Sequence, residues 1–202
     1  MSRAYRDSSG KGLVCGVGIY EPRRLCMTDT PEVRQMYAVW NGMLRRAEPK
    51  YAERYPTYAG TSVAPEFHHF AEFSEWAMRQ VGWDGEGFQL DKDLLTKGNR
   101  VYSPSACVFL PKAVNVLLTR GNANRGDLPI GVKVFRHRGY SARMKIDGKD
   151  TTLGIFKTVA EAFAAYKAAK ESNIRRIADQ YRSQIDPRAY AALLAYQVEI
   201  TD

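Results

Sequence analysis

Apolar residues in the first half of the chain recur every three or four positions, which predicts helices there. The run Thr30-Pro31-Glu32 places a hydroxyl cap, a proline and an acid where a helix begins, and we expect that helix to end before Pro49. A second helix is expected from about Pro65 to Val81. One stripe of it is apolar and predicts core rather than ligand contacts: Phe67, Phe70, Phe73, Trp76 and Ala77.

The pattern in the middle of the chain predicts short strands around a turn-rich loop. Apolar runs at 88–90 and 108–110 predict two strands, and Pro111 begins a helix that carries Asn115. The stretch 121–127 is rich in glycine and asparagine and is a linker by composition. We therefore expect a domain boundary there.

Beyond the linker, apolar and polar residues alternate, as they do in strands with one solvated face. Such alternation occurs at 132–136, 140–146 and 151–156, and Asp147-Gly148 predicts a two-residue hairpin turn. Thr158 is expected to cap a helix that covers the sheet. A last helical region is expected from about 173 to 185, and after an interruption at Pro187 a further short helix to about 196. The predicted fold class is α+β.

The net charge of +8, from 30 Lys plus Arg against 22 Asp plus Glu, favours a polyanionic partner, nucleic acid first. The three cysteines form no CxxC pair, which argues against a cysteine zinc site and fits a reducing cytoplasm. No apolar stretch reaches the roughly 20 residues of a membrane span. The N-terminal residues lack the apolar core of a signal peptide, so we expect a cytoplasmic protein without a membrane partner.

The acids Asp91 and Asp93 follow the first predicted strand and could bind a hard cation. A charged surface turn is the simpler interpretation of an Asp-Lys-Asp string. Gly98-Asn99 and Ser103-Pro104 predict a compact loop after this string, followed by a strand and a helix. That arrangement would bring Asn115 opposite Asp91.

The C-terminal module resembles an AP2 DNA-binding domain. Gly131-Val132, Tyr140-Ser141-Ala142, Leu153-Gly154-Ile155-Phe156 and the Thr158 to Tyr166 segment carry the resemblance. It implies that one face of a three-stranded antiparallel sheet contacts duplex DNA. The residues at the contacting positions are Lys133, Phe135, Arg143, Lys145 and Thr152, provided that Val132, Val134, Ala142, Met144, Leu153 and Ile155 point inward. Thr152 replaces the family's tryptophan, so base preference is not carried over.

The run from Leu90 to Asn115 resembles the HNH (His-Me finger) nucleases, closest to phage-type homing endonucleases with a C-terminal AP2 domain. The resemblance implies a ββα-metal core at about 86–119, with Asp91 and Asn115 holding a divalent ion, Mg²⁺ or Mn²⁺. Lys97 and Arg100 would contact the DNA backbone. Lys92 stands where the family has its histidine base.

Four alternatives for the base stay open. Burial could lower the pKa of Lys92 so that it acts as the base, or Asp93 or a metal-bound hydroxide could act in its place. Tyr102 could orient the water or the phosphate. The last alternative is that the site is inactive.

The sequence thus predicts a helical region with a nuclease core at 1–120, a linker at 121–130, an AP2-like domain at 131–173 and a helical tail at 174–202. The expected function is metal-dependent endonuclease activity on double-stranded DNA, in a phage-encoded protein acting in the bacterial cytoplasm. The alternative is a catalytically silent DNA-binding protein, or one that interacts with a host or phage protein.

Overall fold

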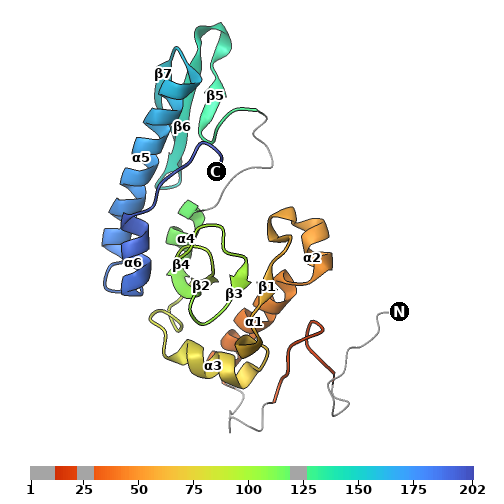
Figure 1. Cartoon of the computed structure of the whole chain (residues 1–202). Coiled ribbons are helices and arrows are strands. Elements are labelled where there is room, and N and C mark those ends of the chain that lie inside the picture. The colour runs from red at the N-terminus through yellow and green to blue at the C-terminus, as the bar shows by residue number, and fades with distance from the viewer. Residues whose placement is uncertain (1–11, 22–29, 119–126) are drawn as a thin grey trace. The chain divides into compact units, whose positions relative to one another are not determined.

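The computed structural model of the chain describes residues 12–21, 30–118 and 127–202. It has the predicted α+β character, with helices and small sheets (Figure 1). The chain forms two compact units. The first takes the described residues up to Lys112 together with Gln184–Ala189, and the second takes those of Ala113–Ser183 together with Tyr190–Asp202. Most of the predicted linker, up to residue 126, lies outside the described residues.

The first unit begins with the predicted helix α1 (Pro31–Arg46), where the Thr30 hydroxyl accepts a hydrogen bond from the Val33 N–H at 3.4 Å. Then come α2 (Pro49–Arg54) and a single 3-10 turn (Pro56–Tyr58). The core of this unit is formed by aromatic and apolar side chains that the sequence pattern predicted, including Trp40, Met43, Phe67, Phe70, Phe73 and Ala77.

The helix predicted from Pro65 to Val81 is shorter than expected. A 3-10 turn (Pro65–Phe67) precedes the helix proper, α3 (Phe70–Met78). The backbone of Ile19 causes the break: its N–H donates to the His68 carbonyl at 2.8 Å, and its carbonyl accepts from the Phe70 N–H at 3.0 Å. The single N–H of Phe70 donates to Ile19 and not to a carbonyl of the preceding turn, so the helix ladder is interrupted and α3 begins here.

Two strand pairs organise the rest of the first unit. β2 (Phe88–Asp91) and β4 (Val108–Pro111) pair antiparallel and confirm the two predicted strands. β1 (Ser62–Val63) and β3 (Val101–Tyr102) pair parallel, which the sequence did not predict. The helix α4 (Lys112–Leu118) follows β4 directly, as predicted from Pro111.

The second unit contains the predicted three-stranded antiparallel sheet, in the order β5 (Val132–Val134), β6 (Tyr140–Ile146) and β7 (Lys149–Phe156). The Asp147-Gly148 hairpin is confirmed, with φ of +48° and +79° at its two residues. A capping box between Thr158 and Glu161 begins α5 (Val159–Gln180), which covers one face of the sheet. The core between them includes Val132, Ala142, Met144, Ala162 and Tyr166.

Two residues predicted to face this core do not. Ile155 is 51% exposed because the pairing of β6 and β7 shifts register between Ala142 and Arg143. The shift leaves Leu153 as an extra residue on β7, and one extra residue reverses the faces of those after it. Val134 is 66% exposed at the last pair of the edge strand β5. The other predicted inward residues are buried or half-buried.

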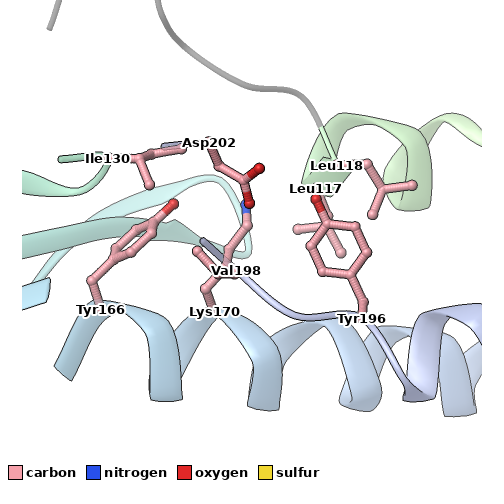
Figure 2. Close-up of a pocket in the computed structure, with 8 residues that line it drawn as sticks. All are labelled: Leu117, Leu118, Ile130, Tyr166, Lys170, Tyr196, Val198 and Asp202. Carbon is pink, nitrogen blue, oxygen red and sulfur yellow. The ribbon is translucent and has the colours of Figure 1, made fainter. Parts of the chain in front are cut away.

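The C-terminal helical region differs from the prediction in its first part. α5 runs without interruption to Gln180, so no separate helix begins near Asn173, and α6 (Pro187–Leu194) begins at Pro187 as expected. The last residues fold back on α5, where Lys167 donates to the Val198 carbonyl at 2.6 Å and Glu171 accepts from its N–H at 2.9 Å. Beside this contact lies a small cavity with room for about one water molecule, lined also by α4 and Ile130 (Figure 2).

In the part of the chain that the structure describes, no helix is both long and apolar enough to cross a membrane.

Candidate active site

Asp91 is the last residue of β2 and is paired in register with Val108 of β4. Its Oδ1 accepts hydrogen bonds from the backbone N–H groups of Asp93 at 3.0 Å and Leu94 at 2.8 Å. A side chain that caps the next residues in this way turns the chain out of the strand. The acid therefore lies at the junction of strand and loop, and only 8% of it is exposed.

The carboxyl group of Asp91 is difficult to ionise. Burial raises its pKa to about 6, and the nearby Asp93 carboxylate adds to the rise, although the two backbone N–H donors oppose it. Oδ1 accepts both backbone hydrogen bonds, and the Asp93 side chain also interacts with this carboxyl group.

The loop after Asp91 is closed by Lys92 and Asn99. The Lys92 ammonium donates to the Asn99 carbonyl at 3.1 Å, while the Asn99 amide donates to the carbonyls of Lys92 at 2.6 Å and Val101 at 2.8 Å. The Asn99 side-chain oxygen accepts from the Val101 N–H at 3.2 Å. We call this reciprocal pair the Lys92–Asn99 clamp. Sequence reasoning assigned Asn99 no role, and its position directly after Gly98 was the only signal.

Lys92 is held by several contacts in this loop. Its side chain is 12% exposed, its Nζ lies 3.5 Å from the Asp93 carboxylate, and it lies 5.7 Å from the centre of the Tyr102 ring. With its hydrogen bond to the Asn99 carbonyl, these contacts tie the Lys92 side chain to its own loop.

Tyr102 is buried beside Lys92, with 3% exposure. Burial raises the pKa of its phenol, and Arg46 opposes that rise only in part. The neutral phenol could donate a hydrogen bond but not take a proton. Of the predicted backbone contacts, Lys97 is exposed, and Arg100 is exposed but donates from its guanidinium to the Ala59 carbonyl.

Asn115 lies in α4 and is half-buried. Asp91 belongs to the first unit and Asn115 to the second, so the idea that they share a cation stays a prediction. Within residues 12–21, 30–118 and 127–202, no three His, Cys, Asp or Glu side chains are grouped so that they could hold a metal ion.

The second unit exposes most of the predicted DNA contacts on the sheet face away from α5. Cross-strand register places Ser141 between Lys133 on one side and Ile155 on the other, and Arg143 beside Thr152. The side chains of Lys133, Arg143, Lys145 and Thr152 are exposed, whereas Phe135 is half-buried under the Arg136 guanidinium at 5.9 Å. Ile155 adds an exposed apolar side chain to this face, which the alternation pattern did not predict.

Replacing Asn99 should loosen the loop that follows Asp91. Asn99→Ala removes three side-chain hydrogen bonds, so we expect the free energy of unfolding to fall by about 1–3 kcal/mol. Chemical denaturation measures this change. Asn99→Asp keeps the acceptor for Val101 but turns a carboxylate oxygen toward the carbonyls of Lys92 and Val101, so we expect it to be at least as destabilised as Asn99→Ala. A loss below about 0.5 kcal/mol for Asn99→Ala would contradict the importance of the clamp.

Comparisons of the chain with protein-family models, with curated proteins and with solved structures find no match.

Proposed function

We propose that the protein is a metal-dependent DNA endonuclease of the HNH type, with an AP2-like module as its duplex-binding part. The observation that carries the proposal is the buried Asp91 carboxylate at the end of β2, where the chain enters a clamped loop and then β4 and α4. A buried acid is costly for a fold, and such groups are concentrated at functional sites.

The donor atoms near Asp91 fit a weakly held, hydrated cation. Mg²⁺ keeps several waters and is commonly bound by one or two carboxylates plus the phosphates of its substrate. Asp91 is the residue of the first unit that would hold the ion, and the family resemblance adds Asn115. When bound, it would act as a Lewis acid toward a phosphodiester and stabilise the departing oxygen.

The second unit supports DNA as the polyanion. Its exposed sheet face carries Lys133, Arg143 and Lys145, and cations placed in this way neutralise phosphates and release counterions. A two-stranded ribbon fits the major groove, so the β6–β7 hairpin is the proposed reading element.

A catalytically silent DNA-binding protein is the second candidate, and Lys92 favours it. The residue in the place of the histidine is a lysine tied into the clamp, and burial raises the pKa of the Tyr102 phenol, so that phenol is no base. The two functions share the same sheet face and differ only in the chemistry at Asp91.

Plasmid nicking separates the two candidates. We expect the protein to convert supercoiled plasmid to the nicked or linear form at low salt with Mg²⁺ or Mn²⁺, and to leave it intact in EDTA. Binding should be measured in parallel by anisotropy across a salt series. Salt-sensitive binding without cleavage in either metal would favour the silent protein, and binding that is independent of salt would count against DNA as the partner.

A further inference from the structure

The first unit carries a group of tyrosines that the candidate active site does not use. The rings of Tyr51 and Tyr55 lie 4.8 Å apart, and those of Tyr51 and Tyr58 lie 5.3 Å apart. We call these three residues the tyrosine cluster. No residue of α2 or of the following turn is buried, and α2 lies at the periphery of its unit (Figure 1). Ring contacts rather than an apolar core therefore hold this segment in place. The Tyr55 side chain remains accessible to solvent, with 41% exposure.

Arginines surround the tyrosine cluster. The Arg54 guanidinium lies 5.4 Å from the centre of the Tyr55 ring, and Arg100 donates to the Ala59 carbonyl at the end of the same turn. Burial opposes the charge of Arg46, but nearby tyrosines, Tyr58 among them through a hydrogen bond, outweigh it and raise the pKa of Arg46. Residues 45–58 hold four basic side chains against two acids. The surface is thus both aromatic and cationic.

Contacts within the first unit connect this surface to the candidate active site. The Lys92 ammonium, next to Asp91 in the chain, lies over the Tyr102 ring. Tyr102 interacts electrostatically with Arg46, which reaches Tyr58. Tyr102 and Arg46 thus join the tyrosine cluster to the loop after Asp91 within the first unit.

We propose that the tyrosine cluster, with Arg54 and Arg100, binds an unpaired stretch of DNA next to the candidate active site. An unpaired base would stack on Tyr55, and the two guanidinium groups would contact flanking phosphates. Every base has a π-face, and stacking on an exposed aromatic ring together with nearby cations is how proteins hold single strands without sequence preference. The identity of the polyanion rests on the proposed function, but the binding does not require cleavage.

A base can stack on a tyrosine ring only when it is unpaired and outside the DNA double helix. The test therefore compares DNA with and without unpaired bases. Anisotropy in EDTA would compare a labelled duplex containing a single-stranded gap with the same duplex fully paired. We expect Tyr55→Ala to weaken binding to the gapped duplex roughly tenfold and to the paired duplex by no more than about twofold. Tyr55→Phe should bind as the wild type does, because it keeps the ring. Arg54→Gln should lower the slope of log affinity against log salt by about 0.7 on the gapped DNA.

The second unit offers a matched control for the arginine–tyrosine pair. The Arg182 guanidinium lies 5.3 Å from the centre of the Tyr190 ring, but the Tyr190 hydroxyl donates to Asp179 at 2.7 Å. Tyr190→Ala should therefore leave the binding of both DNAs unchanged. Circular dichroism and thermal melting of every variant confirm that the fold is retained.

The outcomes separate this proposal from the proposed function. If the wild type binds DNA but Tyr55→Ala changes nothing, or weakens both DNAs equally, the tyrosine cluster is structural and only this proposal is overturned. If the wild type binds neither DNA at low salt, both fail. A second measurement places 5-iodouracil in the gap. Photo-crosslinks to the tyrosine cluster are expected, and crosslinks confined to the second unit would overturn the proposal.

Discussion

Asp91→Asn should abolish DNA cleavage and at the same time make the protein more stable at pH 7.5. The asparagine keeps an oxygen in the place of Oδ1, so the hydrogen bonds from Asp93 and Leu94 can remain. What disappears is the buried negative charge. Without that charge the proposed cation loses its anionic ligand, and we expect cleavage to fall on the order of 1000-fold. Binding to duplex DNA in EDTA should be unchanged.

The pH dependence of the stability gain follows from the raised pKa of Asp91. Its ordinary value is 3.8, and burial, with Asp93, raises the pKa to about 6. The folded state therefore binds the proton more tightly than the unfolded state. The contribution of Asp91 to stability is most favourable below about pH 4, is lost as the pH rises through about 4 to 6, and is constant above that. At pH 7.5 the ionised group costs on the order of 3 kcal/mol.

Urea denaturation between pH 4 and pH 8 checks this expectation. The difference in unfolding free energy between Asp91→Asn and the wild type should be near zero at pH 4 and grow to a gain of up to about 3 kcal/mol at pH 7.5. Asp93→Asn is the neighbouring control, and its gain should be much smaller because the Asp93 side chain is 49% exposed. Millimolar Mg²⁺ should stabilise the wild type but not Asp91→Asn. A variant that is less stable at pH 7.5 would contradict the argument.

Gly131→Ala should unfold the second unit. Gly131 has φ of +77°, where a side chain is strained, and a Cβ there would lie 2.0 Å from the Tyr166 ring. Tyr166 is 4% exposed in the core between α5 and the sheet, so its ring has little room to move. Overpacking of a filled core and the left-handed backbone each cost about 1–3 kcal/mol. Together they are a large fraction of the stability of a small domain.

Gly148→Ala provides the matched control. Gly148 has a φ of +79°, close to that of Gly131, but nothing lies within 4 Å of a Cβ placed there. We expect a loss of about 1 kcal/mol from backbone strain alone, with the sheet intact. Thermal melting and duplex binding should therefore fail for Gly131→Ala and persist for Gly148→Ala. Equal effects of the two variants would show that contact with Tyr166 is unimportant.

The opposite effects expected for Asp91→Asn follow from a conflict between folding and function. Asp91 is buried within 3.0 Å of two backbone donors but has no cationic partner on its carboxylate among the described residues, so it serves the fold poorly. A cation held there in the presence of substrate would remove the penalty. This reasoning supports a functional role for Asp91 independently of the family resemblance.

Local signals in the sequence predicted several elements correctly. Thr30 and Pro31 begin α1, the Asp147-Gly148 pair forms the hairpin between β6 and β7, and Thr158 with Glu161 caps α5. Each of these signals acts over four residues or fewer, and each supplies its own hydrogen bond or backbone angle. The aromatic stripe of α3 was also predicted as core, because its spacing alone places the rings on one face.

The candidate site was predicted only in part. The sequence identified Asp91 and the loop after it, but it could not show that Lys92 and Asn99 clamp that loop. The clamp depends on the path of the chain between them, which the parallel pairing of β1 with β3 helps to fix. It also left four alternatives at this site, and the contacts that tie Lys92 into its loop count against the one in which Lys92 is the base.

The sequence by itself determined the α+β class, the helix starts, the hairpin and the excess of positive charge, because these depend on composition or on neighbouring residues. The tertiary structure alone decided the interruption by Ile19 before α3, the outward turn of Ile155 and the joining of the tyrosine cluster to Tyr102 through Arg46. In each of these cases the deciding contact joins residues that are distant in the chain, and local patterns contain no information about such contacts.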